Sequence, residues 1–135
     1  RMNLVKPTLH QLVLLGQQYF ENRIADAASV VEAFLSAGKS VYVVSAGLNP
    51  AVKIFAALLG IPEQNVYAVD VSFDENGKYL DFDHNAPTTA SGGKRKIIDE
   101  LSKVHPRIIF VGDGMNDVEA SDVVDRFVGF GGHRF

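Results

Sequence analysis

Three segments of the sequence combine residue types that can hold a phosphoryl group. Ser45-Ala46-Gly47 follows the apolar run at residues 41–44, and Gly112-Asp113-Gly114-Met115-Asn116-Asp117 follows the apolar run at residues 108–111. Lys94 opens a helical stretch directly after a Ser-Gly-Gly turn. A hydroxyl and backbone amides can bind phosphoryl oxygens, a lysine can neutralise them, and a carboxylate can bind Mg²⁺. Together these residue types favour a phosphate site with a divalent metal.

Each of these signals also has a plain structural explanation. A serine that follows a strand is more often a turn former or a helix cap than a phosphate ligand. Lys94 taken alone is an ordinary solvated helix residue, and Asp113 and Asp117 could be loop and cap residues. The order of the segments favours a site: strand and Ser-x-Gly, then a helix-opening lysine, then strand and Gly-Asp-Gly-x-Asn-Asp.

The elements around these segments predict an α/β fold with a parallel sheet. Short β-branched or aromatic runs are typical of buried strands, and they alternate with amphipathic helical patterns. At the carboxyl edge of such a sheet the loops converge, so the phosphate-binding segments would meet there. The strands are expected at residues 41–44, 66–69, 108–111 and 127–130, with a hairpin at 71–73 and 78–82. The helices are expected at residues 8–22, 26–37, 49–59, 94–104 and 116–123, with Asn49-Pro50 as the N-cap and first turn of the third.

The composition excludes several classes of protein. The 135 residues carry a formal net charge of -3, which is not the basic footprint of a nucleic-acid-binding protein. No apolar run approaches the roughly 18 residues that a membrane span needs. The chain has no cysteine, so a disulfide scaffold, a thiolate metal site and a cysteine nucleophile are excluded. This composition fits a reducing compartment, and we expect a cytoplasmic protein without a nucleic-acid or membrane partner.

The ordered segments resemble motifs II, III and IV of the haloacid dehalogenase-like (HAD) phosphotransferases, and agree best with the phosphoserine phosphatase family. Asp83 to Ile98 resembles the loop that delivers that family's catalytic lysine, and Phe127 to Gly132 resembles its last core strand and exit turn. The resemblance implies a Rossmann-like three-layer parallel sheet. It also implies that residues 1–23 are the end of a helical cap, and that residues 24–135 are an α/β core that is incomplete at both ends.

The same resemblance implies a Mg²⁺-dependent phosphomonoesterase that hydrolyses O-phospho-L-serine to L-serine and phosphate through an aspartyl-phosphate. Lys94 would stabilise the nucleophile and the charge on the phosphoryl oxygens, Asp117 would orient Lys94, and Asp113 would bind the metal. Arg1 resembles the cap arginine that binds the substrate carboxylate. The residues expected to contact the substrate or its phosphate are Arg1, Ser45, Ala46, Gly47, Lys94 and Asn116.

The family's motif I, Asp-x-Asp-x-Thr after an apolar strand, is missing from the sequence. The only Asp-x-Asp segment is Asp81-Phe82-Asp83, which follows a hairpin strand and lies on the wrong side of motif II, so we interpret it as a polar strand exit. In the family's fold the motif I strand lies between the strands that carry motifs II and IV. We therefore expect those two strands not to pair here, and we expect the chain to be inactive on its own.

Two other functions remain open. The chain could belong to a HAD phosphatase or phosphotransferase for another small phosphorylated metabolite, since the cap decides the substrate. It could also be a degenerate homologue that binds a phosphorylated ligand without turnover. The residues encoded upstream of Arg1 would distinguish an active enzyme from the degenerate homologue. Asp-x-Asp-x-Thr there favours the enzyme, and a substituted first Asp favours the homologue that only binds.

Overall fold

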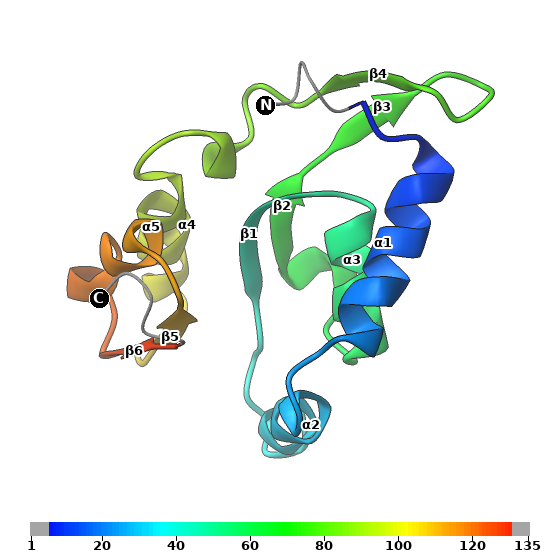
Figure 1. Cartoon of the computed structure of the whole chain (residues 1–135). Coiled ribbons are helices and arrows are strands. Elements are labelled where there is room, and N and C mark those ends of the chain that lie inside the picture. Colours follow the sequence, from blue (N-terminus) through cyan, green and yellow to red (C-terminus); the bar gives the residue numbers. More distant parts are fainter. Residues whose placement is uncertain (1–5, 131–135) are drawn as a thin grey trace. The chain divides into compact units, whose positions relative to one another are not determined.

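The computed structural model describes residues 6–130, and the chain divides between Ala86 and Pro87 into two compact units. In Figure 1 the first unit runs from blue to green and the second from yellow-green to red. The first unit consists of α1 (Leu9–Glu21), α2 (Ala27–Ser36), β1 (Val43–Leu48), α3 (Ala51–Leu58), the short helix η1 (Glu63–Asn65), β2 (Val66–Val69), β3 (Val71–Phe73) and β4 (Tyr79–Phe82). The second unit consists of η2 (Pro87–Thr89), α4 (Gly93–Ser102), β5 (Ile109–Gly112), α5 (Met115–Val118), η3 (Ser121–Val123) and β6 (Arg126–Gly129). No helix among the described residues is long and apolar enough to cross a membrane.

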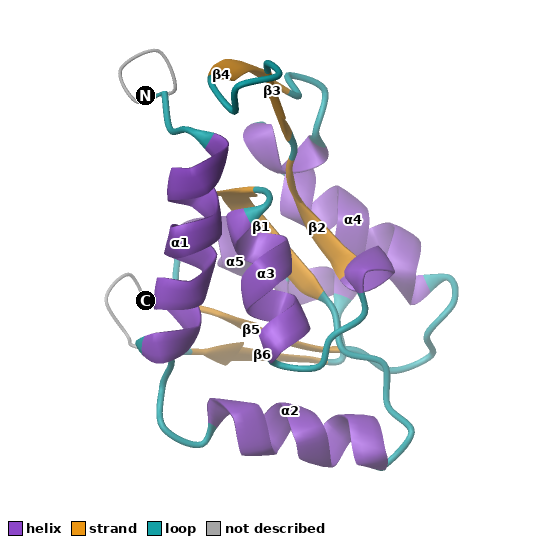
Figure 2. Ribbon diagram, turned by 90° about the vertical axis from the view of Figure 1, so that its right-hand side faces the viewer, coloured by secondary structure: helices purple, strands orange, loops and turns teal. Residues whose placement is uncertain are grey.

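The first unit is built in layers around α3, which lies between α1 and the β1–β2 sheet (Figures 1 and 2). Leu12 of α1 and Val52 and Ala56 of α3 are buried. A Cβ at Gly16 of α1 would lie 2.6 Å from the carbonyl oxygen of Ala51, so the glycine allows the two helices to approach closely. This contact fixes the helix that follows β1.

The beginnings of α1 and α3 are formed in different ways. Thr8 caps α1 with a capping box, because its hydroxyl accepts the N–H of Gln11 at 3.1 Å and its own N–H donates to Oε1 of Gln11 at 2.9 Å. The expected start of this helix is confirmed. The expected role of Asn49 as a cap is wrong: α3 has Pro50 as its N-cap, and the buried Asn49 side chain donates to Oδ1 of Asp70 at 2.9 Å.

The strands confirm an α/β fold with parallel pairing. β1 pairs in parallel with β2, β5 pairs in parallel with β6, and β3 and β4 form the expected antiparallel hairpin. The described strands form three two-stranded sheets, two in the first unit and one in the second. Ile109 and Val111 on β5 are 61% and 58% exposed, so the second unit leaves these apolar side chains of the strand uncovered.

Some apolar residues of the helical patterns are exposed. Val30 and Phe34 of α2 are 51% and 48% exposed, and no residue of α2 is buried. Helical periodicity identifies an apolar face but not the element that covers it. Val104 is 74% exposed and lies beyond the last residue of α4. The helix expected at residues 116–123 is also shorter, because α5 ends at Val118 and a separate 3₁₀ turn follows.

Candidate active site

Asp117 is the buried centre of a polar cluster in the second unit. It is 5% exposed, and its Oδ1 lies 2.7 Å from Nζ of Lys94. Its Oδ2 accepts the backbone N–H groups of Asp113 at 3.0 Å and Gly114 at 3.1 Å. A buried carboxylate is tolerated only when it is paired and hydrogen-bonded, and here both oxygens have partners. The Asp117 carboxylate therefore fixes the position of the lysine ammonium relative to the loop after β5.

Local backbone features place Lys94 within reach of Asp117. Gly92 has φ of 77°, a conformation that favours glycine, and it serves as the N-cap of α4. A Cβ on Gly93 would overlap the carbonyl oxygen of Pro87, so this glycine lets the start of α4 pack against η2. Lys94 is consequently a first-turn residue of α4, and its side chain reaches a carboxylate 23 positions later in the sequence.

Asp113 lies next to this cluster with its carboxylate exposed. Its backbone N–H donates to Asp117, whereas its side chain has no hydrogen bond or ion pair with the side chains that the structure describes, which exclude those of residues 115 and 116. Within the same range no group of three or more His, Asp or Glu side chains could hold a metal ion. Asp113 therefore offers one oxygen ligand, which fits Mg²⁺ because this ion is commonly held by one or two carboxylates together with waters and substrate phosphate.

The Ser45-Ala46-Gly47 segment belongs to the first unit and lies within β1, not after the strand as expected. Val44 pairs with Tyr67 and Leu48 with Val69, so β1 advances four residues where β2 advances two. The three residues therefore bulge out of the ladder, as often happens beside active sites. The N–H of Gly47 donates to Oγ of Ser45 at 2.9 Å, which folds the bulge into a compact turn with the Ser45 hydroxyl on it.

The structure brings Lys94, Asp113 and Asp117 together in one unit and describes Ser45, Ala46 and Gly47 in the other. Arg1 and the side chain of Asn116 lie outside the described residues. The roles expected for all these residues remain predictions.

Sequence reasoning overlooked a polar group at the carboxyl ends of β1 and β2. Nδ2 of Asn49 donates to Asp70, the Nζ of Lys53 is 3.9 Å from the same carboxylate, and Oδ1 of Asn49 is buried without a partner in the described part of the chain. The position of Asp70 directly after a strand was the signal that could have identified this group. Asn49 was missed because it was assigned to a helix cap.

The second unit contains a glycine whose replacement we expect to be costly. A Cβ on Gly112, the last residue of β5, would overlap Cβ of Asp117, which cannot move away because Lys94 and two backbone amides hold it. We expect Gly112→Ala to lower the free energy of unfolding by about 1–3 kcal/mol, the usual cost of overpacking. Thermal or urea unfolding would measure it.

Gly114→Ala provides the matched control for this substitution. A Cβ on Gly114 would meet Oδ2 of Asp117 at 3.9 Å, an ordinary contact. An equal loss of stability in the two variants would contradict the close packing of Gly112 against Asp117.

Comparisons with known proteins agree on one family. Residues 7–122 match the family model described as haloacid dehalogenase-like hydrolase. The chain is 36% identical to phosphoserine phosphatases from Drosophila melanogaster and Rattus norvegicus over 98% of its own length. It spans only 50% and 60% of the length of those two relatives. Among solved structures, a phosphoserine phosphohydrolase-like protein from Francisella tularensis superimposes with a TM-score of 0.77 at 22% identity, covering 91% of this chain and 58% of that one.

Proposed function

The chain belongs to the haloacid dehalogenase-like hydrolase family, and we propose that it is part of a Mg²⁺-dependent phosphomonoesterase acting on O-phospho-L-serine. The observation that carries this proposal is the Lys94–Asp117 ion pair, to which the exposed residue Asp113 is joined through its backbone N–H. Relatives at 36% identity are named phosphoserine phosphatases, which supports the substrate. The proposal includes a cytoplasmic setting, with which the absence of cysteine is consistent.

In this proposal Lys94 binds the phosphoryl oxygens and offsets the negative charge that gathers on them during transfer. Phosphoryl transfer depends mainly on positioning and electrostatic stabilisation, so an ammonium held at a fixed place is useful. Asp117 supplies that fixed place, because its other oxygen is tied to the backbone of the Asp113-Gly114 turn. The lysine therefore does not need to reorganise when the substrate binds.

The bulge at Ser45 would provide a second phosphate contact. Its hydroxyl can donate to a phosphoryl oxygen, and the N–H of Gly47, now bonded to Oγ of Ser45, can turn to a stronger anionic acceptor. Bulged backbone supplies amides that the strand ladder does not use.

Asp113 would hold Mg²⁺, with substrate phosphate and water completing the oxygen ligands. When bound, the ion reduces the repulsion between an anionic nucleophile and the phosphate. In the family's covalent route a carboxylate attacks phosphorus, the P–O bond to the serine oxygen breaks, and that oxygen takes up a proton to leave as the serine hydroxyl; water then hydrolyses the acyl phosphate to inorganic phosphate and the free carboxylate. None of the 135 printed residues is assigned the role of that nucleophile.

Release of inorganic phosphate from O-phospho-L-serine by the full-length protein tests this function. We expect steady turnover with Mg²⁺ and loss of turnover in EDTA, restored by added Mg²⁺. Undiminished activity in EDTA would contradict the metal requirement. Binding of the substrate without any phosphate release would favour the degenerate homologue over the enzyme.

A further inference from the structure

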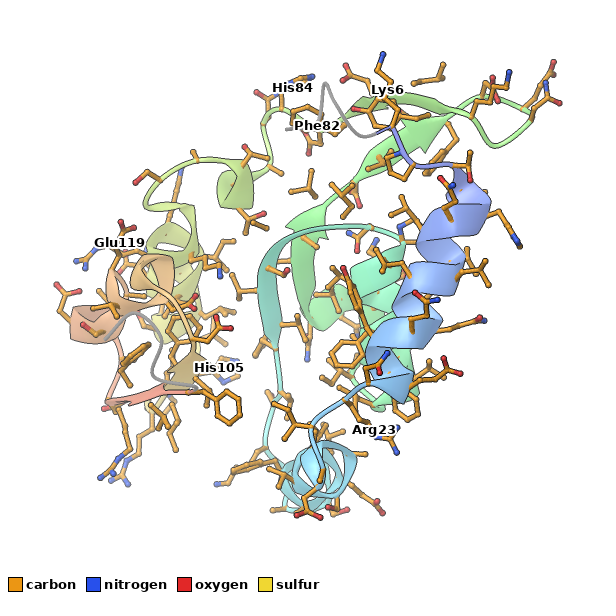
Figure 3. The ribbon with its side chains drawn as sticks, in the orientation of Figure 1. Lys6, Arg23, Phe82, His84, His105 and Glu119 are labelled. Atoms are coloured by element: carbon orange, nitrogen blue, oxygen red, sulfur yellow. The ribbon has the colours of Figure 1, made fainter. Side chains whose placement is uncertain are left out.

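The first turn of α4 is tied to the segment after Asp117 by contacts other than the Lys94 ion pair. The N–H of Gly92 donates to Oε2 of Glu119 at 3.2 Å. Nη1 of Arg95 donates to the carbonyl oxygen of Glu119 at 3.1 Å and also to the carboxylate of Asp122. Figure 3 labels Glu119 in this region, close to α4 and α5. The two segments are 24–27 positions apart in the sequence, so these contacts are tertiary.

These contacts join residues that are close in sequence to Lys94 with residues that follow Asp117. Gly92 and Arg95 flank Lys94 along the chain, and Glu119 and Asp122 follow Asp117. A lysine has a flexible four-carbon stem, so the direction from which its ammonium approaches a partner depends on how firmly its backbone is held. The planar guanidinium of Arg95 can bond a carbonyl and a carboxylate at once, which fixes the first turn of α4 in more than one direction.

We propose that Arg95, Glu119 and Asp122 form a clamp that positions Lys94 against Asp117, and that the clamp matters for the reaction more than for the stability of the fold. The inference rests on the proposed function, since Lys94 is the group that would contact the phosphate. Arg95, Glu119 and Asp122 are positioning residues: they act on the phosphate only through Lys94.

The exposure of the Arg95–Asp122 ion pair argues for a positioning role over a purely structural one. The side chains of Arg95 and Asp122 are 43% and 66% exposed, and ion pairs this exposed contribute little to stability. The hydrogen bond and charge of Asp122 raise the pKa of Arg95, and the hydrogen bond from Arg95 lowers the pKa of the Asp122 carboxyl. The pair therefore stays charged at neutral pH. Its loss should alter the placement of Lys94 while leaving the rest of the unit folded.

The test uses the full-length protein with Arg95→Ala, Arg95→Lys and a control, Lys103→Ala. Lys103 is the C-cap of α4, one position beyond its last residue, and forms an exposed ion pair with Glu100 at 3.1 Å. Its removal therefore deletes the same charge as Arg95→Ala without touching the clamp. Three quantities are measured: the kcat and KM for phosphate release, the melting temperature, and the rate at which an amine-reactive reagent labels Lys94, followed by mass spectrometry.

In Arg95→Ala we expect kcat to fall about tenfold, because a displacement of an ångström or less at a catalytic group has effects of this order. KM should change less than kcat, Lys94 should be labelled faster, and the melting temperature should fall no more than in Lys103→Ala. Arg95→Lys should recover part of kcat, because an ammonium keeps the charge but not the two-acceptor geometry.

Unchanged kcat and unchanged labelling of Lys94 in Arg95→Ala would overturn the clamp, and so would an equal loss in Lys103→Ala. If the wild-type protein releases no phosphate, the proposed function fails. The labelling of Lys94 then still decides whether the clamp positions this side chain.

Discussion

Replacing Lys94 with alanine is expected to lower kcat for phosphate release from O-phospho-L-serine by about 10²–10³-fold, the usual cost of removing one preorganised group that stabilises transition-state charge. The lysine ammonium is 2.7 Å from the buried carboxylate of Asp117. Among the described side chains, it supplies the positive charge of this cluster. Steady-state kinetics on the purified full-length protein would measure the loss. Lys103→Ala, at the C-cap of the same helix, should retain kcat.

The same substitution leaves Asp117 without its counter-ion, so lost stability must be separated from lost catalysis. We expect Lys94→Ala to destabilise the fold by about 1–3 kcal/mol, because one oxygen of a buried carboxylate loses its partner. Adding Asp117→Asn removes that charge and should recover part of the stability. Activity should stay low in the double variant, and recovery of both together would show that Lys94 serves the fold alone.

Replacing Asp113 with asparagine is expected to reduce turnover at a fixed Mg²⁺ concentration by about 10²-fold or more, since a catalytic metal supplies several kcal/mol of charge stabilisation. The side chain of Asp113 is exposed and bonds no other described group, so the fold should not depend on it. The Mg²⁺ concentration for half-maximal rate should rise, while the melting temperature stays close to that of the wild type. Activity titrated with Mg²⁺ would show both effects.

Asp83→Asn is the control for this prediction, because Asp83 is also exposed and belongs to the only Asp-x-Asp segment of the chain. Its carboxylate accepts the N–H of Asn85 at 3.0 Å in a turn of the first unit. We expect the variant to keep its turnover and its Mg²⁺ dependence. A collapse of activity in Asp83→Asn with an unaffected Asp113→Asn would reverse the assignment of the two carboxylates.

Local sequence signals predicted much of the fold, because helix caps, hairpin turns and short strands are determined by residues that are close in the sequence. The capping pair Thr8 and Gln11 begins α1 where the sequence indicated, and the hairpin turn at residues 74–77 forms with Gly77 at φ of 81°. The strands expected at residues 66–69, 108–111 and 127–130 also appear within one residue of their predicted limits. These features depend on neighbours a few positions away.

What the sequence could not predict depends on distant partners. The bulge that takes Ser45 into β1 follows from the register with β2, and Asn49 leaves its cap position to bond Asp70, 21 positions later. The order of the motifs identifies Lys94 and Asp117 as candidate site residues. No local sequence pattern predicts the contacts of Arg95 with Glu119 and Asp122. Side chains that meet across the fold are visible only once the chain is folded.

The proposed hydrolysis of O-phospho-L-serine is tested most directly by a comparison with O-phosphoethanolamine. The two substrates share a phosphate and an amine, and only the first has the carboxylate that Arg1 is expected to bind from the family resemblance. We predict a kcat/KM for O-phospho-L-serine that is higher by about 10²-fold or more, because a site built to pair a polar group rejects the analogue that lacks it. Equal or faster hydrolysis of O-phosphoethanolamine by the full-length protein would contradict the account.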